Sequence, residues 1–370
     1  MICVETQYFN LTRIILFAIG LWPNEKSKFR KLQAILCFGV LTSFLIFQFC
    51  FHYILYNLIF ILNYIKNMLQ QLQYFYNELK DENEFAIFKK YGHYFRQCTI
   101  ILTALMVCYI FIVTLLPIWQ QIFDTVLYIN ESQLQSQTMQ FMIKYFVDEE
   151  KLFYLILLHI KAAFCIGAIT MVGTGTMFLG YIIHICGLLT ITSYRVEQIL
   201  TTKTSKNMRN QIMIYNKKIF YAVEIHYKIM KFCEYLCSNF KGSFFLLLIC
   251  TVSSLSLNLF GMFQNASLGN SKGFLLHLLF SFAIILFMFL VNHFGQEIIN
   301  HNNHVYFTAY NSQWYNASLH AQKMILFILL RSSRDCNLNI GGIFVASFEC
   351  FFSLIKTAVS YFTVIYSIEE

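Results

Sequence analysis

Long apolar runs constrain this chain more than any other feature of its sequence. Six runs are long enough to cross a bilayer, at about residues 33–63, 99–119, 153–192, 244–263, 273–293 and 343–367. Only helices and closed barrels satisfy their backbone groups in lipid. Of 370 residues, 58% are hydrophobic, 12% are charged and 2 are proline, which favours long helices. The sequence therefore predicts an all-α, polytopic transmembrane helical bundle in a lipid bilayer.

The basic residues between the runs predict orientation, because Lys and Arg gather in cytoplasmic loops. Three segments are rich in them, namely residues 1–32, 64–98 and 193–243. Two segments hold few, namely residues 120–152 and 264–273. We therefore expect a cytoplasmic N-terminus and an external C-terminus. The two basic-poor loops carry glycosylation sequons at Asn130 and Asn265.

The first apolar run conflicts with this orientation. Both its flanks are basic, which demands an even number of crossings, yet only 34 residues separate Lys31 from Lys66. Two crossings need about 20 residues each plus a turn. Either the region is a compressed hairpin or the chain lacks part of a span, and we favour the second interpretation.

The last apolar run carries a polar stripe. Its members are three and four residues apart and so share one helix face, namely Ser353, Lys356, Ser360, Thr363 and Ser367. Such a face is costly against lipid and should meet protein or water. The helix resembles a pore-lining helix, although a stripe of small residues packed on a neighbouring helix has the same pattern.

These features divide the chain into four parts. We expect a cytoplasmic N-terminal segment (1–32), a transmembrane bundle (33–293) with long cytoplasmic helix extensions at about 180–243, a cytoplasmic anchor helix region (294–342) and a C-terminal pore-lining helix (343–370). Apolar residues at helical spacing predict cytoplasmic helices over about 212–236 and 316–332, where subunits could associate.

The sequence offers little for an enzyme or a metal site. His301 and His304 could share a helix face but have no third ligand nearby, so we interpret them as solvated polar residues. Gly173 and Gly175 lie in an apolar helix, where close packing explains them better than a ligand. The net charge of +8 reflects cytoplasmic loops and gives no indication of nucleic acid. We expect no catalytic residues, no cofactor and no metal.

Several segments together resemble the insect odorant receptors. They are 358–367 (Ala-Val-Ser-Tyr-Phe-Thr-Val-Ile-Tyr-Ser), the preceding 341–347 (Gly-Gly-Ile-Phe-Val-Ala-Ser), Gln296-Glu297, Tyr310 with Trp314-Tyr315, Gln322-Lys323, 184–187 (His-Ile-Cys-Gly), 193–195 (Ser-Tyr-Arg) and 78–84. The resemblance covers about residues 64–370. Family members have seven spans, with two full ones where this chain has 33–63, so the first two spans are shortened here.

The resemblance implies an odour-gated, non-selective cation channel in the plasma membrane of olfactory sensory neuron dendrites. An odour-specific subunit of this kind assembles with the shared co-receptor of the family as a heterotetramer, around one pore lined by each last helix. By position in the matching motif, Val364 and Ile368 would form the hydrophobic gate, with the polar Ser367 and Ser360 on the same helix. A hydrophobic constriction closes a pore by excluding water.

The resemblance also implies a pocket for a small volatile organic ligand in the outer half of the bundle. Such a pocket needs apolar and aromatic walls with few polar groups. The candidates at the outer helix ends are Phe111, Leu115, Trp119, Tyr154, His159, Phe164, Met262, Phe263, Phe274 and His277. Any one of these aromatic residues could instead contact lipid or pack within the bundle.

Three other functions fit a helical membrane protein. A seven-span G-protein-coupled receptor would have an external N-terminus, which the basic N-terminal segment opposes. A secondary transporter tends to show internal repeats and broken helices, and neither is evident. A gustatory receptor-type channel, from the sister family, tends to end in Thr-Tyr, five apolar residues and Gln-Phe, where this chain has Ser360-Tyr361 and Ser367-Ile368.

Overall fold

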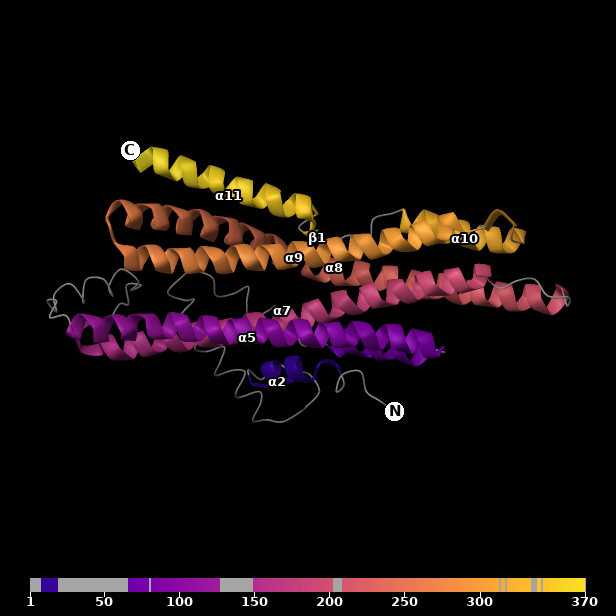
Figure 1. Cartoon of the computed structure of the whole chain (residues 1–370), viewed down its shortest axis with the longest axis horizontal. Helices are drawn as coiled ribbons and strands as arrows, with labels where there is room; N and C mark the ends of the chain where they lie inside the picture. The colour runs from indigo at the N-terminus through magenta and orange to yellow at the C-terminus, as the bar shows by residue number, and fades with distance from the viewer. Residues whose placement is uncertain are drawn as a thin grey trace. The chain divides into compact units, whose positions relative to one another are not determined.

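The computed structural model describes residues 8–18, 66–79, 81–126, 149–201, 208–312, 314–316, 318–333, 338–340 and 342–369, and these are nearly all helical. The elements are α2 (Asn10–Ala18), α5 (Glu82–Val126), α7 (Glu149–Thr201), α8 (Met208–Ser267), α9 (Ser271–Asn311), η1 (Trp314–Asn316), α10 (Leu319–Ser332), β1 (Asn339–Ile340), β2 (Phe344–Val345) and α11 (Phe348–Glu369) (Figure 1). Residues 66–78 form a further helix.

Five of the described helices are long and apolar enough to cross a membrane, within α5, α7, α8, α9 and α11. They match the last five apolar runs, which confirms the predicted helical membrane bundle. The first run, 33–63, lies outside the described residues, and so do the expectations about its shortened spans.

The two longest helices extend far beyond the thickness of a bilayer. The α7 helix has 53 residues and α8 has 60. At about 1.5 Å per residue they measure about 80 and 90 Å, against a hydrocarbon core of about 30 Å. Each is one unbroken helix longer than a single crossing needs, a length that fits the predicted extensions beyond the membrane for 153–192 and for the amphipathic stretch before 244.

The chain forms two compact units. The first contains residues 1–85 and 92–181, and the second contains residues 86–91 and 182–370. In the first unit, α2 packs on small residues of α5 and α7. The ring of Phe9 lies 4.6 Å from that of Phe95, and a Cβ on Gly180 would meet both rings. A Cβ added to Gly173 would likewise meet Leu16 of α2, which confirms close packing there. A Cβ added to Gly175 would meet no described atom of a neighbouring element within 4 Å.

In the second unit, α8 and α9 run side by side, joined by a tight turn (Figure 1). Gly269 adopts φ +68° in that turn, and Asn270 caps α9 by accepting a hydrogen bond from the Gly273 N–H at 3.2 Å. The α11 helix lies along the same hairpin (Figure 1). The buried residues at this contact are Val252, Leu255, Met288, Cys350, Leu354 and Ala358.

The segment between α10 and α11 is a small antiparallel hairpin rather than helix. Asn339 of β1 pairs with Val345 of β2, and Gly342 adopts φ +84° between them. The Ser347 hydroxyl then accepts a hydrogen bond from the Cys350 N–H at 3.2 Å, as an N-cap residue does. The last helix therefore begins at Phe348, after the start at 343 that hydrophobicity alone predicts.

Candidate functional site

One face of α11 is fixed against the α8–α9 hairpin. Cys350, Leu354 and Ala358 are four residues apart and all buried. The Ser256 hydroxyl of α8 lies 3.0 Å from the carbonyl oxygen of Ala358, which adds a polar contact to this apolar interface. These contacts set the rotation of α11 about its own axis and hence which residues remain uncovered.

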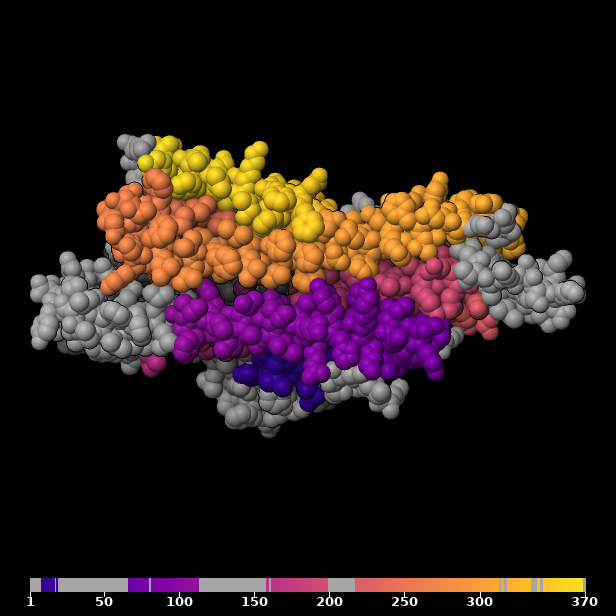
Figure 2. Space-filling model, viewed as in Figure 1, coloured from indigo at the N-terminus to yellow at the C-terminus, as the bar shows by residue number. Residues whose placement is uncertain are grey.

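The opposite face of α11 carries the predicted polar stripe. All five of its residues, Ser353, Lys356, Ser360, Thr363 and Ser367, are exposed. In the space-filling view α11, in yellow, lies at the surface with its outer side uncovered along its length (Figure 2). Two hydroxyls bond to their own helix, since Thr363 donates to the Ser360 carbonyl at 2.8 Å and Ser367 to the Val364 carbonyl at 3.0 Å.

The two gate candidates lie near the C-terminal end of α11, beside the stripe rather than on it, because Ile368 is five whole turns after Cys350 and projects from the same face. Val364 is 52% exposed and Ile368 is 79% exposed. No described residue of the chain covers either side chain enough to bury it. Large apolar residues left open in a folded chain call for another partner, which here is lipid, a second subunit or the pore itself.

The odour-pocket candidates of the second unit lie near the α8–α9 turn. The His277 Nδ1 lies 3.0 Å from the Asn258 Oδ1, and a Cβ on Gly261 would meet the His277 ring at 2.7 Å. Phe263 of α8 contacts α11, because its ring centroid lies 4.8 Å from that of Tyr366 and 6.2 Å from that of Phe362. Met262 and Phe274 are both half-buried close to this turn.

The remaining candidates belong to the first unit. The Phe164 ring of α7 lies 6.2 Å from the Tyr109 ring of α5, so this pair joins the two helices. Phe111 is 63% exposed, and His159 is half-buried. Leu115, Trp119 and Tyr154 lie on α5 and α7, but their side chains are outside the described set. The ten candidates are thus divided between the two units, with six in the first and four in the second.

The two glycosylation candidates differ in what surrounds them. Asn130 lies outside the described residues. Asn265 lies in the last turns of α8, where its Nδ2 donates to the Gly261 carbonyl at 2.7 Å and its Oδ1 accepts from Asn270 at 2.8 Å. A glycan on Asn265 would replace one of the two hydrogens on this Nδ2 atom and leave one N–H to donate.

The start of α11 is held by two side chains of α9. The buried Asn292 accepts a hydrogen bond from the Ser347 N–H at 3.1 Å, and Gln296 lies 3.5 Å from the Phe348 N–H. Between them, Gly295 lies so close to Ala346 that no side chain would fit. Free N–H groups at a helix start need such acceptors when they are buried. The sequence interpretation did not identify Asn292, although an amide within an apolar run is itself an indication of a polar contact.

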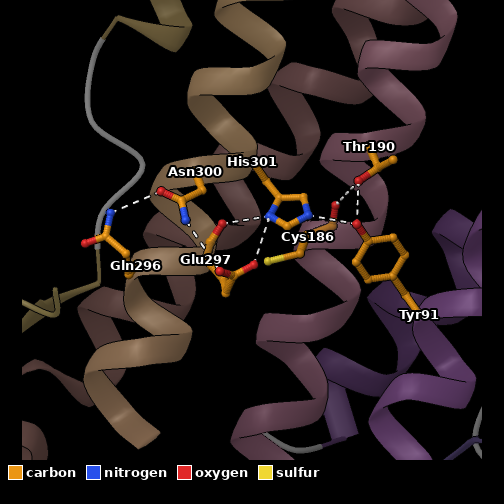
Figure 3. Close-up of polar contacts among 7 residues, drawn as sticks. All are labelled: Tyr91, Cys186, Thr190, Gln296, Glu297, Asn300 and His301. Carbon is orange, nitrogen blue, oxygen red and sulfur yellow. Dashed lines mark hydrogen bonds and ion pairs between the residues drawn. The ribbon is translucent and has the colours of Figure 1, made fainter. Parts of the chain in front are cut away.

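A polar network continues from Gln296 along α9 to α7 and to residues 86–91 (Figure 3). Gln296 Nε2 donates to Asn300 at 3.1 Å, and His301 Nδ1 lies 2.7 Å from the Glu297 carbonyl oxygen. The Tyr91 hydroxyl lies 2.7 Å from His301 Nε2 and 2.9 Å from the Thr190 hydroxyl. The prediction that His301 is solvated is therefore wrong, because its Nε2 atom pairs with the Tyr91 hydroxyl. His304 is exposed and contacts the Ser193 hydroxyl at 3.1 Å.

The α10 helix packs on α8 and α9 through a second polar cluster. Asn302 donates to the Ser332 carbonyl at 2.8 Å, and His226 Nε2 lies 3.2 Å from the Ser332 hydroxyl. Arg331 and Glu234 form an ion pair between α10 and α8. Among the described residues no three His, Cys, Asp or Glu side chains form a group that could hold a metal ion.

Comparison with known proteins identifies a family and solved structures that this chain resembles. The profile of a family described as 7tm Odorant receptor matches residues 36–359. The chain is also similar to the insect olfactory receptor OR5 from Machilis hrabei in complex with eugenol, with TM-score 0.75, 18% identity and 98% of each chain covered. A second structure of the same receptor gives TM-score 0.63, 16% identity and 98% coverage of each chain. No curated protein sequence matches the chain at a significant level.

Proposed function

We propose a function from one premise: this chain belongs to the 7tm odorant receptor family. It is a multi-pass membrane protein with the fold of an insect olfactory receptor. We infer that it is the odour-specific subunit of an odour-gated, non-selective cation channel. In that assembly the family's shared co-receptor completes a heterotetramer in the plasma membrane of olfactory neuron dendrites, and α11 of each subunit lines the pore.

The observation that carries this proposal is the contrast between the two faces of α11. Cys350, Leu354 and Ala358 are buried on α8 and α9, while the stripe from Ser353 to Ser367 is uncovered. A chain that used the stripe only for its own helix packing would cover it. An uncovered polar face inside a membrane requires water or a second subunit, and a central pore supplies both.

The Machilis hrabei receptor is described in complex with eugenol, a small aromatic molecule. A similar class of ligand suits the candidates here, since the outer helix ends provide aromatic walls with a few polar groups. Phe263 supports a coupling route, because it joins the outer end of α8 to Tyr366 near the proposed gate. A ligand that displaces Phe263 would thereby act on α11.

Expression of the chain with and without the co-receptor tests the subunit assignment. We expect odour-evoked, non-selective cation current from a panel of small aromatic and aliphatic volatiles only when both chains are present. Co-receptor alone, challenged with the same panel, is the control for responses that do not need this chain. A full odour response from this chain expressed alone would contradict the proposed assembly.

A matched pair of cysteine variants tests the pore assignment. Ser360 is exposed on the stripe, whereas Ala358 is buried against α8. In the co-expressed channel we expect a charged, membrane-impermeant thiol reagent to change the current of Ser360→Cys. The same reagent should affect the current of Ala358→Cys no more than that of the parent channel. The native Cys350 on the buried face provides an internal control. Equal insensitivity of both variants would remove α11 from the permeation path.

A further inference from the structure

We propose that Lys356 places a fixed positive charge in the ion path of this channel and thereby limits its cation conductance. The proposal deepens the proposed function, because it depends on the stripe of α11 lining the pore. It concerns a residue that determines permeation, whereas the gate candidates Val364 and Ile368 determine opening.

The first argument is the cost of a lysine at this place. Between Phe348 and Ile368 the only charged residues are Glu349 and Lys356, and Lys356 lies near the middle of the helix. A lysine at the centre of a membrane helix is unfavourable unless water or a counter-charge compensates it. An ionisable residue within a span therefore indicates a functional position, and a partner must be found for it.

The second argument is that the described part of the chain provides no such partner. Lys356 is exposed, and none of the ion pairs among the described residues includes it. Glu349 is exposed on the same stripe but seven residues earlier, which is about 10 Å along the helix axis and too far for an ion pair. The ammonium group therefore requires water, which the proposed pore contains.

The third argument is its position around the helix. Lys356 lies on the stripe between Ser353 and Ser360, opposite Leu354 and Ala358, whose burial fixes the rotation of α11. If Ser360 faces the pore, Lys356 one turn earlier faces it too, because residues four apart share a helix face. The serine hydroxyls present no net charge to an ion, so Lys356 and Glu349 are the charged residues of this face, and Lys356 is the one near the middle of the helix.

A positive charge beside the path repels cations and attracts anions. At about 4 Å in water, one unit charge changes the local concentration of a monovalent ion by about fivefold. The effect weakens as salt screens the charge, with a Debye length of about 10 Å at 0.1 M and about 3 Å at 1 M. Lys356 should therefore reduce cation conductance chiefly at low ionic strength.

The test uses the full chain co-expressed with the co-receptor and carrying Lys356→Gln, Lys356→Glu or Lys356→Arg. We expect single-channel cation conductance at low salt to increase from the parent to Gln to Glu, by up to about fivefold, and the differences to shrink at 1 M salt. Relative chloride permeability, from reversal potentials in a salt gradient, should fall in the same order. Lys356→Arg should match the parent. The control is Lys323→Gln, on the exposed side of α10, which should change neither quantity.

A further variant covers the case in which the charge changes impair assembly. Lys356→Cys is allowed to assemble and is then treated with an aminoethyl thiol reagent, which restores a positive side chain. We expect high conductance before treatment and the parent conductance after it. The role of Lys356 would be overturned if Lys356→Gln, Lys356→Glu and treated Lys356→Cys all kept the conductance and reversal potential they are compared with. This conclusion requires that Ser360→Cys still reacts with the thiol reagent, and it leaves the pore-lining role of α11 intact. Loss of both responses would overturn the pore-lining role of α11 as well.

Discussion

At the scale of single residues, the uncovered side chains of α11 differ in what exposure to water costs them. Thr363 and Ser367 satisfy their hydroxyls on their own backbone, so they can face either water or protein at little cost. Val364 and Ile368 gain nothing from exposure to water. Four such pairs facing one another would close a narrow pore by excluding water.

The gate prediction follows from this. Val364→Ser or Ile368→Ser should lower the barrier to water and leave an odour-independent leak or an altered reversal potential in the co-expressed channel. Leu330→Ser is the control, since Leu330 is also an exposed aliphatic residue, at 67%, but lies on α10 and outside the proposed pore helix. The leak should be absent in that control. If both gate variants keep the reversal potential of the parent channel and show no odour-independent leak, Val364 and Ile368 are excluded from the gate.

At the scale of elements, the junction between α9 and α11 decides where the last helix begins. The Ser347 N–H is one of the groups at that helix start, and the buried Asn292 is its acceptor. A buried N–H without an acceptor costs about 1–3 kcal/mol, so the junction contributes a measurable part of the stability of the unit.

We therefore expect Asn292→Ala to lower the thermal unfolding temperature of the detergent-solubilised complex. Gln296→Ala is the matched comparison, because its longer contact to the Phe348 N–H is exposed to solvent and water can replace it. Asn292→Ala should also shift the odour concentration needed for half-maximal current, since it loosens the start of the proposed pore helix. Equal unfolding temperatures for the two variants would show that Asn292 does not anchor the junction.

Within each element, the sequence predicts side-chain patterns that repeat along a helix and misses contacts between residues far apart in the chain. The shared face of the α11 stripe follows from residues three and four apart, and the structure leaves that face exposed, whereas the sequence left open whether protein or water meets it. The partner of Asn292 is 55 residues away and that of His301 is 210 residues away. No local pattern contains such pairings, which is why Asn292 was missed and His301 was interpreted as solvated. The β1–β2 hairpin was hidden for a related reason, because its residues are apolar enough to extend the helical run.

At the scale of the whole molecule, the sequence predicts how the chain is oriented in the membrane. Lys and Arg counts predict a cytoplasmic N-terminus, an external C-terminus and external sequons at Asn130 and Asn265. Epitope tags at both ends, stained with and without permeabilisation, should detect only the C-terminal tag on intact cells. Removal of the sequons should abolish any shift in mobility on glycosidase treatment. An N-terminal tag visible on intact cells would reverse the predicted orientation.

The length of α8 has a mechanical consequence. One unbroken helix carries His226 beside α10, Ser256 beside α11 and Asn258 beside His277. If α8 tilts as one rigid body about 90 Å long, a tilt of about 5° around its middle moves each end by about 4 Å. Strain introduced at one end therefore reaches the other without any chain of side-chain rearrangements. Substitutions around His226 should consequently alter the odour concentration for half-maximal current as strongly as substitutions at the pocket candidates, although His226 lies beside α10, far along α8 from those candidates.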